Sequence, residues 1–228
     1  MAIQLKNTSA VHLHKVKALV YGQAGAGKTT LAVTMPKPII ISAEGGLLSI
    51  AGSGIDYIEI SSMQELQEAY SWVAGPEASH FESVVLDSLS EIGEVVLSAE
   101  KNRTVNGKLV DPRQAYGAMQ DQMTALIRAF RDLPNKHVLM TAKLEKSQDE
   151  MGRMLYAPSM PGNKMGQAIP FFFDCVFALR VEKDAENNTQ RALMTDSDGL
   201  WQAKCRIRGV DAWEAPDMTA IINKIGEH

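Results

Sequence analysis

Short apolar runs alternate along this chain with segments that have the features of amphipathic helices. The runs at 17–21, 38–42, 81–87 and 137–141 have the length of strands and are mainly apolar, which is typical of buried strands in a parallel sheet. Between them, a capping-box pattern at 62–65 and an Asp-Pro pair at 111–112 predict the starts of two helices. Apolar side chains then recur at helical spacing and predict core positions, at Met119, Met123, Leu126, Ile127 and Phe130. The alternation predicts an α/β fold, a mostly parallel central sheet flanked by helices.

The last third of the chain has a different pattern. A dense apolar segment at 171–181 is followed by strand-like segments at 191–195 and 201–207, and turn residues separate all three. This predicts an antiparallel C-terminal meander that closes the sheet, followed by a final helix at 217–225. No shift in composition divides the chain, so we expect a single domain over 1–228.

A glycine-rich segment follows the first apolar run and fits the phosphate-binding pattern Gly-x-x-x-x-Gly-Lys-[Ser/Thr]. Its glycines permit turns that other residues resist and let the backbone approach a phosphate closely. Free N–H groups at the start of the next helix would point at the anion, the lysine would reach the β and γ phosphates, and the threonine hydroxyl would ligate Mg²⁺. The expected binding residues are Gly22, Gln23, Ala24, Gly25, Ala26, Gly27, Lys28, Thr29 and Thr30.

Two carboxylates stand at the ends of apolar runs, where ligands bind in open α/β sheets. Glu44 is placed to face a nucleotide, with a solvated loop acid as the alternative interpretation. Asp87 would hold Mg²⁺ beside the Thr29 hydroxyl, with an Asp that only starts a turn as the alternative. Because Ser88 rather than a glutamate follows Asp87, a water-activating carboxylate must come from elsewhere, and Glu44 is the best candidate. We interpret Glu91 as a helix cap.

Two long polar segments, 98–114 and 143–166, are predicted to be mobile loops. The basic residues of 98–114 could contact a polyanion, and a solvated surface loop explains this segment equally well. The segment 143–166 is of a length that is usually functional or disordered, and its basic residues could line one groove. The candidate contacts are Lys101, Arg103, Lys108, Arg113, Lys143, Lys146, Arg153 and Lys164.

Composition narrows the remaining possibilities. The net charge of −4 rules out a global basic field but leaves room for a local basic loop, because salt screens charges over about 8 Å. Two cysteines form no disulfide framework and fit a reducing cytoplasm, and no histidine stands at zinc-ligand spacing from a Cys or Glu. No apolar run has membrane-span length, so no membrane partner is expected. Residues 1–16 are expected to be a lead-in strand or an oligomerisation arm.

Several of these segments together resemble one family. The glycine-rich loop, Ile-Ile-Ile-Ser-Ala-Glu44, Val-Val-Leu-Asp87-Ser88 and Val-Leu-Met-Thr141 with a long loop after it are similar to the RecA/RadA ATPase core. The chain most resembles short, phage-encoded RecA-core proteins described as ATP-binding or single-strand annealing proteins. The resemblance spans roughly residues 15 to 225.

The resemblance implies an ATPase that uses ATP and Mg²⁺ and acts on single-stranded DNA in recombination or annealing. Lys28, Asp87 and Glu44 would be catalytic, and Thr141 lies near the position that senses the γ-phosphate. Lys204 and Arg206 lie where basic residues of the family could reach a neighbour's nucleotide, with surface charges on an edge strand as the equally weighted alternative. The first interpretation implies a homo-oligomeric ring or filament. A single-strand-binding protein is a further possible partner. Two alternatives stay open, an ATP-gated binding module with negligible turnover and, less favoured, a small-molecule phosphotransferase.

Overall fold

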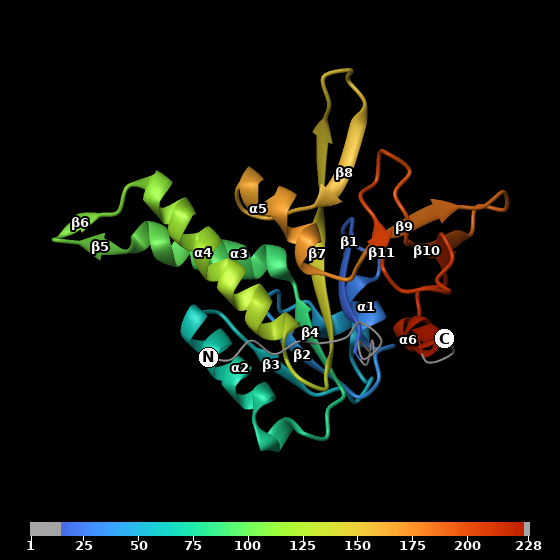
Figure 1. Ribbon diagram of the computed structural model, residues 1–228, viewed down its shortest axis with the longest axis horizontal. Coiled ribbons are helices and arrows are strands. Elements are labelled where there is room, and N and C mark those ends of the chain that lie inside the picture. Colours follow the sequence, from blue (N-terminus) through green and yellow to red (C-terminus); the bar gives the residue numbers. More distant parts are fainter. Residues whose placement is uncertain (1–14, 226–228) are drawn as a thin grey trace, which may run out of the picture.

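The computed structural model describes residues 15–225, so the expected arm at 1–16 lies almost entirely outside the described residues (Figure 1). One large sheet of ten strands, in the order β12-β10-β9-β1-β7-β4-β2-β3, forms the centre, with β8 paired to β7 and β11 paired to β9. Its strands are β1 (Lys17–Gly22), β2 (Pro38–Ser42), β3 (Tyr57–Glu59), β4 (Ser83–Asp87), β7 (His137–Gln148), β8 (Met154–Pro158), β9 (Cys175–Lys183), β10 (Thr189–Met194), β11 (Lys204–Cys205) and β12 (Trp213–Glu214).

Helices cover both faces of this sheet. They are α1 (Lys28–Ala32), α2 (Met63–Ala74), α3 (Leu89–Asn102), α4 (Pro112–Arg131), α5 (Asn163–Ala168) and α6 (Met218–Ile225). Short 3₁₀ turns are η2 (Leu47–Ile50), η3 (Pro76–Ala78) and η4 (Ile169–Phe172). Of the helices in residues 15–225, none is both long and apolar enough to cross a membrane.

The sheet is parallel where the sequence predicted it. Strands β3, β2, β4, β7, β1 and β9 pair parallel, and β10 then pairs antiparallel with β9. Ile39 and Ile41 pack into one core and Ile40 into the other, because alternate side chains of a strand point to opposite faces. Helices α2, α3 and α4 cover the first face, and α1 and α6 cover the second (Figure 1). The predicted α/β fold is therefore confirmed.

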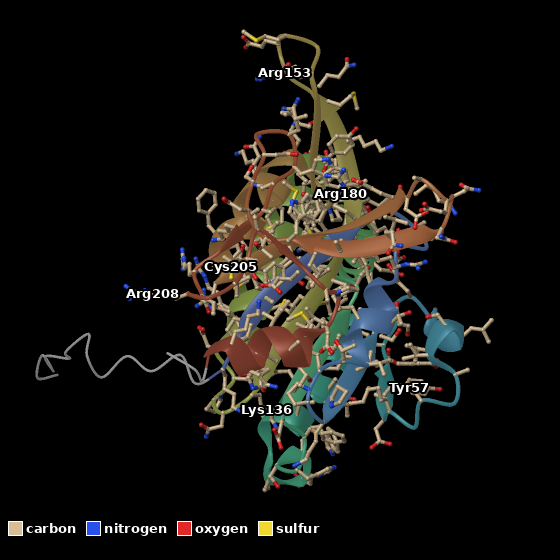
Figure 2. All side chains as sticks on the ribbon, turned by 90° about the vertical axis from the view of Figure 1, so that its right-hand side faces the viewer. Tyr57, Lys136, Arg153, Arg180, Cys205 and Arg208 are labelled. Atoms are coloured by element: carbon tan, nitrogen blue, oxygen red, sulfur yellow. The ribbon has the colours of Figure 1, made fainter. Side chains whose placement is uncertain are left out.

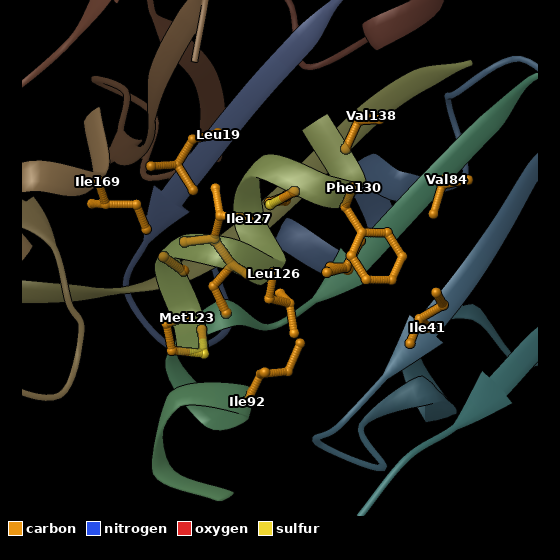
Figure 3. Packing of buried hydrophobic residues seen from close by; sticks show 14 of the residues in the cluster. Leu19, Ile41, Val84, Ile92, Met123, Leu126, Ile127, Phe130, Val138 and Ile169 are labelled. Atoms are coloured by element: carbon orange, nitrogen blue, oxygen red, sulfur yellow. The ribbon is translucent and has the colours of Figure 1, made fainter. Parts of the chain in front are cut away.

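Helix α4 supplies much of the first core. All five of its predicted core residues are buried, and Figure 3 shows Met123, Leu126, Ile127 and Phe130 among side chains from the sheet and α3. Burying a side chain of this size contributes about 1.5–3 kcal/mol. Asp111 caps the helix by accepting a hydrogen bond from the Arg113 amide at 2.8 Å.

The segment 98–114, predicted to be a loop, has regular structure instead. Helix α3 continues to Asn102, and a two-stranded hairpin of β5 (Thr104–Val105) and β6 (Lys108–Leu109) follows before α4 begins. Asn106 and Gly107 both have positive φ, as the tight turn of a two-residue hairpin requires. The hairpin projects from the end of the α3–α4 pair (Figure 1).

The segment 143–166 is also not a continuous loop. Strand β7 runs on to Gln148 and pairs antiparallel with β8, so that a hairpin projects from the sheet, and α5 follows it (Figure 1). The Asp149 carboxylate closes the turn by accepting hydrogen bonds from the amides of Met151 and Arg153. The outer part of the hairpin covers no core, so its residues lack the apolar alternation that identifies strands in a sequence.

The C-terminal meander differs from its prediction in two respects. Strand β9 begins at Cys175 rather than at 171, because Pro170 lies in the 3₁₀ turn before it. The segment predicted as a third strand at 201–207 is reduced to β11, which pairs with the start of β9, whereas β12 takes the place beside β10. β9 thus pairs with β11 near its start and with β10 along its later part.

Candidate functional site

The glycine-rich loop turns sharply between β1 and α1. Gly25 and Gly27 have φ values of 73° and 103°, a conformation that side-chain-bearing residues rarely adopt. The Ala26 amide donates to the Gln23 carbonyl at 3.2 Å, which closes the turn. Among residues 15–225, no side chain caps Gly27 at the start of α1. Successive loop amides in such a turn make a concave site for an anion.

Lys28 holds its ammonium group at this loop. Its Nζ donates to the carbonyls of Gly22 and Gln23 at 3.0 and 3.1 Å. Burial lowers the pKa of Lys28, while the carboxylates of Glu44 and Asp87 raise it. The two acids therefore help to keep a positive charge where phosphates would bind.

Asp87 lies at the centre of a hydroxyl cluster on one sheet face. Ser42 is the register partner of Asp87, and Thr141 follows the β7 partner of Leu86, so the side chains of Ser42, Asp87 and Thr141 lie side by side. The Thr141 hydroxyl donates to Oδ1 of Asp87 at 2.5 Å, and the Thr29 hydroxyl donates to Oδ2 at 2.6 Å. The structure thus joins α1, β4 and β7 at one carboxylate.

The donor set at Asp87 suits Mg²⁺. Hydroxyl and carboxylate oxygens are the ligands that this ion prefers, and it is usually held by one or two carboxylates together with substrate phosphates. Thr29 and Asp87 are the residues that would hold it. Ser42 Oγ is buried and has no hydrogen-bond partner within residues 15–225, so it is free to bond a water of the ion. Those residues contain no cluster of three His, Cys, Asp or Glu side chains that could hold a metal by itself.

Glu44 also reaches this group. Its Oε1 accepts a hydrogen bond from the hydroxyl of Ser88, the residue after Asp87, and lies 4.0 Å from Nζ of Lys143. Lys143 in turn bonds Glu91 at 2.6 Å, and this hydrogen bond raises the pKa of Lys143. The sequence assigned Lys143 to a DNA-facing loop, whereas the structure places it beside Glu44. The sequence interpreted Glu91 as a helix cap, whereas its side chain pairs with Lys143, and the cap of α3 is the Ser88 hydroxyl, which accepts a hydrogen bond from the Glu91 amide.

A cleft of about 640 Å³ opens over the glycine-rich loop, within the range of small-molecule sites. The loop from Ala24 to Thr30, Glu44 and Arg191 are among its lining residues. Arg191 was not predicted from the sequence. Its Nε donates to the Ala26 carbonyl at 3.1 Å, so the guanidinium lies against the loop.

The sequence pattern predicts which side of the sheet Arg191 faces, but not that it lies at the glycine-rich loop. It alternates in β10 with the buried Leu193 and therefore faces the same side of the sheet as α1. The sequence does not reveal that β10 lies two strands away from β1, and this neighbourhood is what brings Arg191 to the loop.

The other predicted basic residues lie outside the cleft. Lys204 is in β11, which pairs with the start of β9, whereas the glycine-rich loop follows the far end of the parallel strand β1. Arg206 pairs with Asp174 at 3.6 Å. The cleft of this chain is therefore lined by neither residue, and a role at a neighbour's nucleotide stays a prediction.

The predicted DNA contacts differ in how well their charges are balanced. On the β7–β8 hairpin, Arg153 is paired with Asp149 at 2.7 Å. Arg153 lies near the tip of this hairpin (Figure 2). Around the β5–β6 hairpin, Arg103 is paired with Glu100 at 2.7 Å, and Lys101 lies over the ring of Tyr116. No ion pair within residues 15–225 involves the remaining candidates Lys101, Lys108, Arg113, Lys146 and Lys164.

Comparison with known proteins identifies the domain type. No curated protein matches the chain. A family model described as an AAA domain matches residues 14–207, a stretch that includes the glycine-rich loop, Glu44, Asp87 and Arg191. This match confirms the predicted P-loop nucleotide-binding domain and indicates an ATPase type, while the RecA-like and annealing assignments stay predictions. Since the match covers most of its length, the chain belongs to the AAA domain family.

Proposed function

We propose that this protein binds ATP with Mg²⁺ and hydrolyses it in the cleft over the glycine-rich loop. The observation that supports this proposal is the convergence of three parts of the fold at this loop: α1 with Lys28 and Thr29, the end of β4 with Asp87, and the segment after β2 with Glu44. The loop amides and Lys28 would bind and orient the phosphates. A bound Mg²⁺ would neutralise phosphate charge, with Thr29 and Asp87 as its protein ligands.

Glu44 is proposed to accept the proton of the attacking water. It is the carboxylate that lines the cleft, whereas both oxygens of Asp87 accept hydroxyl hydrogen bonds. Its link to the Ser88 hydroxyl and its proximity to Lys143 fix its orientation. General-base catalysis of this kind contributes roughly 10²- to 10⁴-fold in rate.

Glu44→Gln should lower the ATP hydrolysis rate by at least about 100-fold and leave ATP affinity within about threefold. Lys28→Ala should weaken ATP binding itself. Glu59→Gln, an exposed change in β3, is the matched control and should behave like the wild type. Turnover and nucleotide binding would be measured separately, by phosphate release and by titration calorimetry. A Glu44→Gln protein that hydrolyses ATP at the wild-type rate would contradict the assignment.

We further propose that the ATPase is of the RecA type and acts on single-stranded DNA in phage-type recombination or annealing. The order of motifs supports this, as does the β5–β6 hairpin, around which Lys101, Lys108 and Arg113 lack carboxylate partners within residues 15–225. Stimulation of ATP hydrolysis by single-stranded DNA, lost in Lys28→Ala, is the expected result. A rate that DNA leaves unchanged would argue for a protein partner, such as a single-strand-binding protein.

An oligomer is part of the same proposal. Lys204 and Arg206 lie at the edge of the sheet opposite to the cleft, so either could serve a nucleotide only in an adjacent copy of a ring or filament. Mixing Lys28→Ala subunits with Arg206→Ala subunits tests this. Hydrolysis restored in the mixture would support a shared site, and no restoration would contradict it.

The second candidate function is an ATP-gated binding module with negligible turnover. The observation that favours it is Lys143, which stands at the root of the β7–β8 hairpin and contacts both Glu91 and Glu44. A triphosphate in the cleft would compete with the carboxylates of Glu91 and Glu44 for the Lys143 ammonium group. A move of Lys143 would then shift the β7–β8 hairpin. Under this reading Glu44→Gln leaves the biological activity unchanged.

A further inference from the structure

The only two cysteines of the chain lie opposite each other on neighbouring strands. Cys205 in β11 is the register partner of Cys175 in β9, although about 30 residues separate them in the sequence. The amide of Arg206 donates to the carbonyl of Asp174, so on this side of the cysteines the ladder hydrogen bond joins the two flanking residues. Cys175 and Cys205 are therefore a non-hydrogen-bonded pair, the kind in which facing side chains come closest.

The two sulfur atoms are in contact. Sγ of Cys175 and Sγ of Cys205 are 2.9 Å apart, and both thiols are free. The Cα separation of such a cross-strand pair falls within the range that a disulfide bridges without movement of the backbone.

The two thiols differ in access and in acidity. Cys175 is fully buried, whereas Cys205 is partly exposed. The hydrogen bond between the two sulfur atoms, helped by the Ile207 amide, lowers the pKa of Cys205 despite burial and the carboxylates of Asp174 and Glu214. The same bond, together with burial, raises the pKa of Cys175. Since the thiolate is the nucleophile in disulfide exchange, Cys205 is the residue that attacks first.

We propose that Cys175 and Cys205 form a dithiol site that reacts with small-molecule disulfides and closes into an intramolecular cross-strand disulfide. The Cys205 thiolate attacks one sulfur of the small disulfide, forms a mixed disulfide and releases one small thiolate. Cys175 then attacks the Cys205 sulfur, and the second small thiolate leaves. The two protons of the protein thiols pass to the two released thiolates. The protein is oxidised by two electrons, and the small disulfide is reduced to two thiols.

The site is separate from the nucleotide cleft. β11 pairs with the start of β9, whereas the cleft lies beyond the end of the adjacent strand β1, and the cleft is lined by neither cysteine. Figure 2 places Cys205 near Arg208, well away from the hairpin tip that Arg153 marks. Closing the bond would tie β11, and the connection from β10 that leads to it, to the central sheet.

The test uses glutathione disulfide on the full-length protein. Because the chain has two cysteines, thiol titration should fall from two groups per chain to none, and a non-reduced digest should contain a peptide that joins Cys175 to Cys205. Oxidation should raise the thermal midpoint by roughly 5–10 °C, and a dithiol reductant should reverse the rise. Thiols that persist, or a disulfide between two chains, would overturn the proposal.

Two single variants separate the roles of the thiols. Cys175→Ala should stop at a stable mixed disulfide on Cys205. Cys205→Ala should react at least roughly tenfold more slowly, because the remaining thiol is buried and of raised pKa. Equal rates in the two variants would contradict the assigned order of attack. If either variant fails to fold, the non-reduced digest of the wild-type protein still shows whether the disulfide forms.

Discussion

At the residue scale, single side chains join elements that are distant in the sequence. Asp87 accepts hydrogen bonds from Thr29 and Thr141, and Arg191 fastens β10 to the glycine-rich loop. These hydrogen bonds also stabilise the fold. A buried polar atom that loses its hydrogen-bond partner destabilises the folded state by about 1–3 kcal/mol. The site is therefore tied to the stability of the fold as well as to its chemistry.

Arg191→Ala should weaken ATP binding by roughly tenfold, because it removes a cation from a cleft that would hold a polyanion and also frees the Ala26 carbonyl. Arg153→Ala, at the distant hairpin tip, is the matched control and should leave nucleotide affinity unchanged. Calorimetric titration with ATP measures both. Equal affinities for the two variants would show that Arg191 has no part in binding.

His137 should make the fold sensitive to acid. Burial, and next the charges of Lys15 and Lys17, lower its pKa to about 4, while Glu82 acts in the opposite direction. Its Nδ1 accepts a hydrogen bond from the Val16 amide, which requires the neutral ring. Since the folded pKa lies below the ordinary value of about 6.5, the unfolded chain binds more protons between these values. The free energy of unfolding should fall by about 2 kcal/mol as the pH drops from 6.5 to 4.

The His137→Gln variant isolates this contribution, because it keeps a polar side chain that does not titrate. Urea denaturation at several pH values should show a shallower loss of stability below pH 6.5 in the variant than in the wild type. Parallel curves for the two proteins would mean that the histidine is not the titrating group.

At the element scale, the β7–β8 hairpin is anchored to the strand that leads into the glycine-rich loop. The Tyr21 hydroxyl donates to the Tyr156 carbonyl at 3.1 Å, and the Tyr156 ring stacks on Trp201 with centroids 4.2 Å apart. The guanidinium of Arg180 covers the Trp201 ring at 4.2 Å. One tryptophan thus joins β8, β9 and the β10–β11 connection.

Trp201→Ala should lower the free energy of unfolding by about 2 kcal/mol, because it removes an aromatic stack and a cation–π contact at a half-buried position. The loss of unfolding free energy in Trp201→Phe should be at most half of the loss in Trp201→Ala. Urea denaturation measures the totals, and faster amide hydrogen exchange in β8 would locate the loss at the hairpin. Unchanged exchange in β8 would mean that the stack does not anchor it.

At the scale of the whole molecule, charge is unevenly distributed. The net charge is −4, yet three cations around the β5–β6 hairpin have no carboxylate partner within residues 15–225. On the β7–β8 hairpin, by contrast, Lys143, Lys146 and Arg153 are balanced in number by Glu145, Asp149 and Glu150. If the protein binds single-stranded DNA, the smaller hairpin is the better candidate for its phosphate contacts.

The logarithm of the DNA affinity should fall with the logarithm of salt concentration with a slope of about −2 to −3, as expected for three or four phosphate contacts. Lys108→Ala should make the slope shallower by about 0.7. Lys37→Ala removes a lysine paired with Glu82 at 2.6 Å and should leave the slope unchanged. Fluorescence anisotropy with a labelled oligonucleotide measures all three. A flat salt response would remove the DNA role.

The sequence by itself determined the elements whose pattern is local. Buried strands, capped helices and the glycine-rich loop are specified by residues close together in the chain, since apolar periodicity and turn chemistry act over a few positions. Asp87 and Glu44 were predicted because each stands at the end of such a run. The two hairpins were missed where strands are exposed and lack a buried face, although Asn106 and Gly107 did carry a turn signal.

Only the tertiary structure decided which elements are neighbours. The strand order places Arg191 against the glycine-rich loop and Thr141 beside Asp87. It also places Lys143 beside Glu44 and Cys175 opposite Cys205. The same strand order places Lys204 and Arg206 outside the cleft of their own chain. These contacts depend on strand order and register, which result from the packing of the whole chain and which no local window of residues contains.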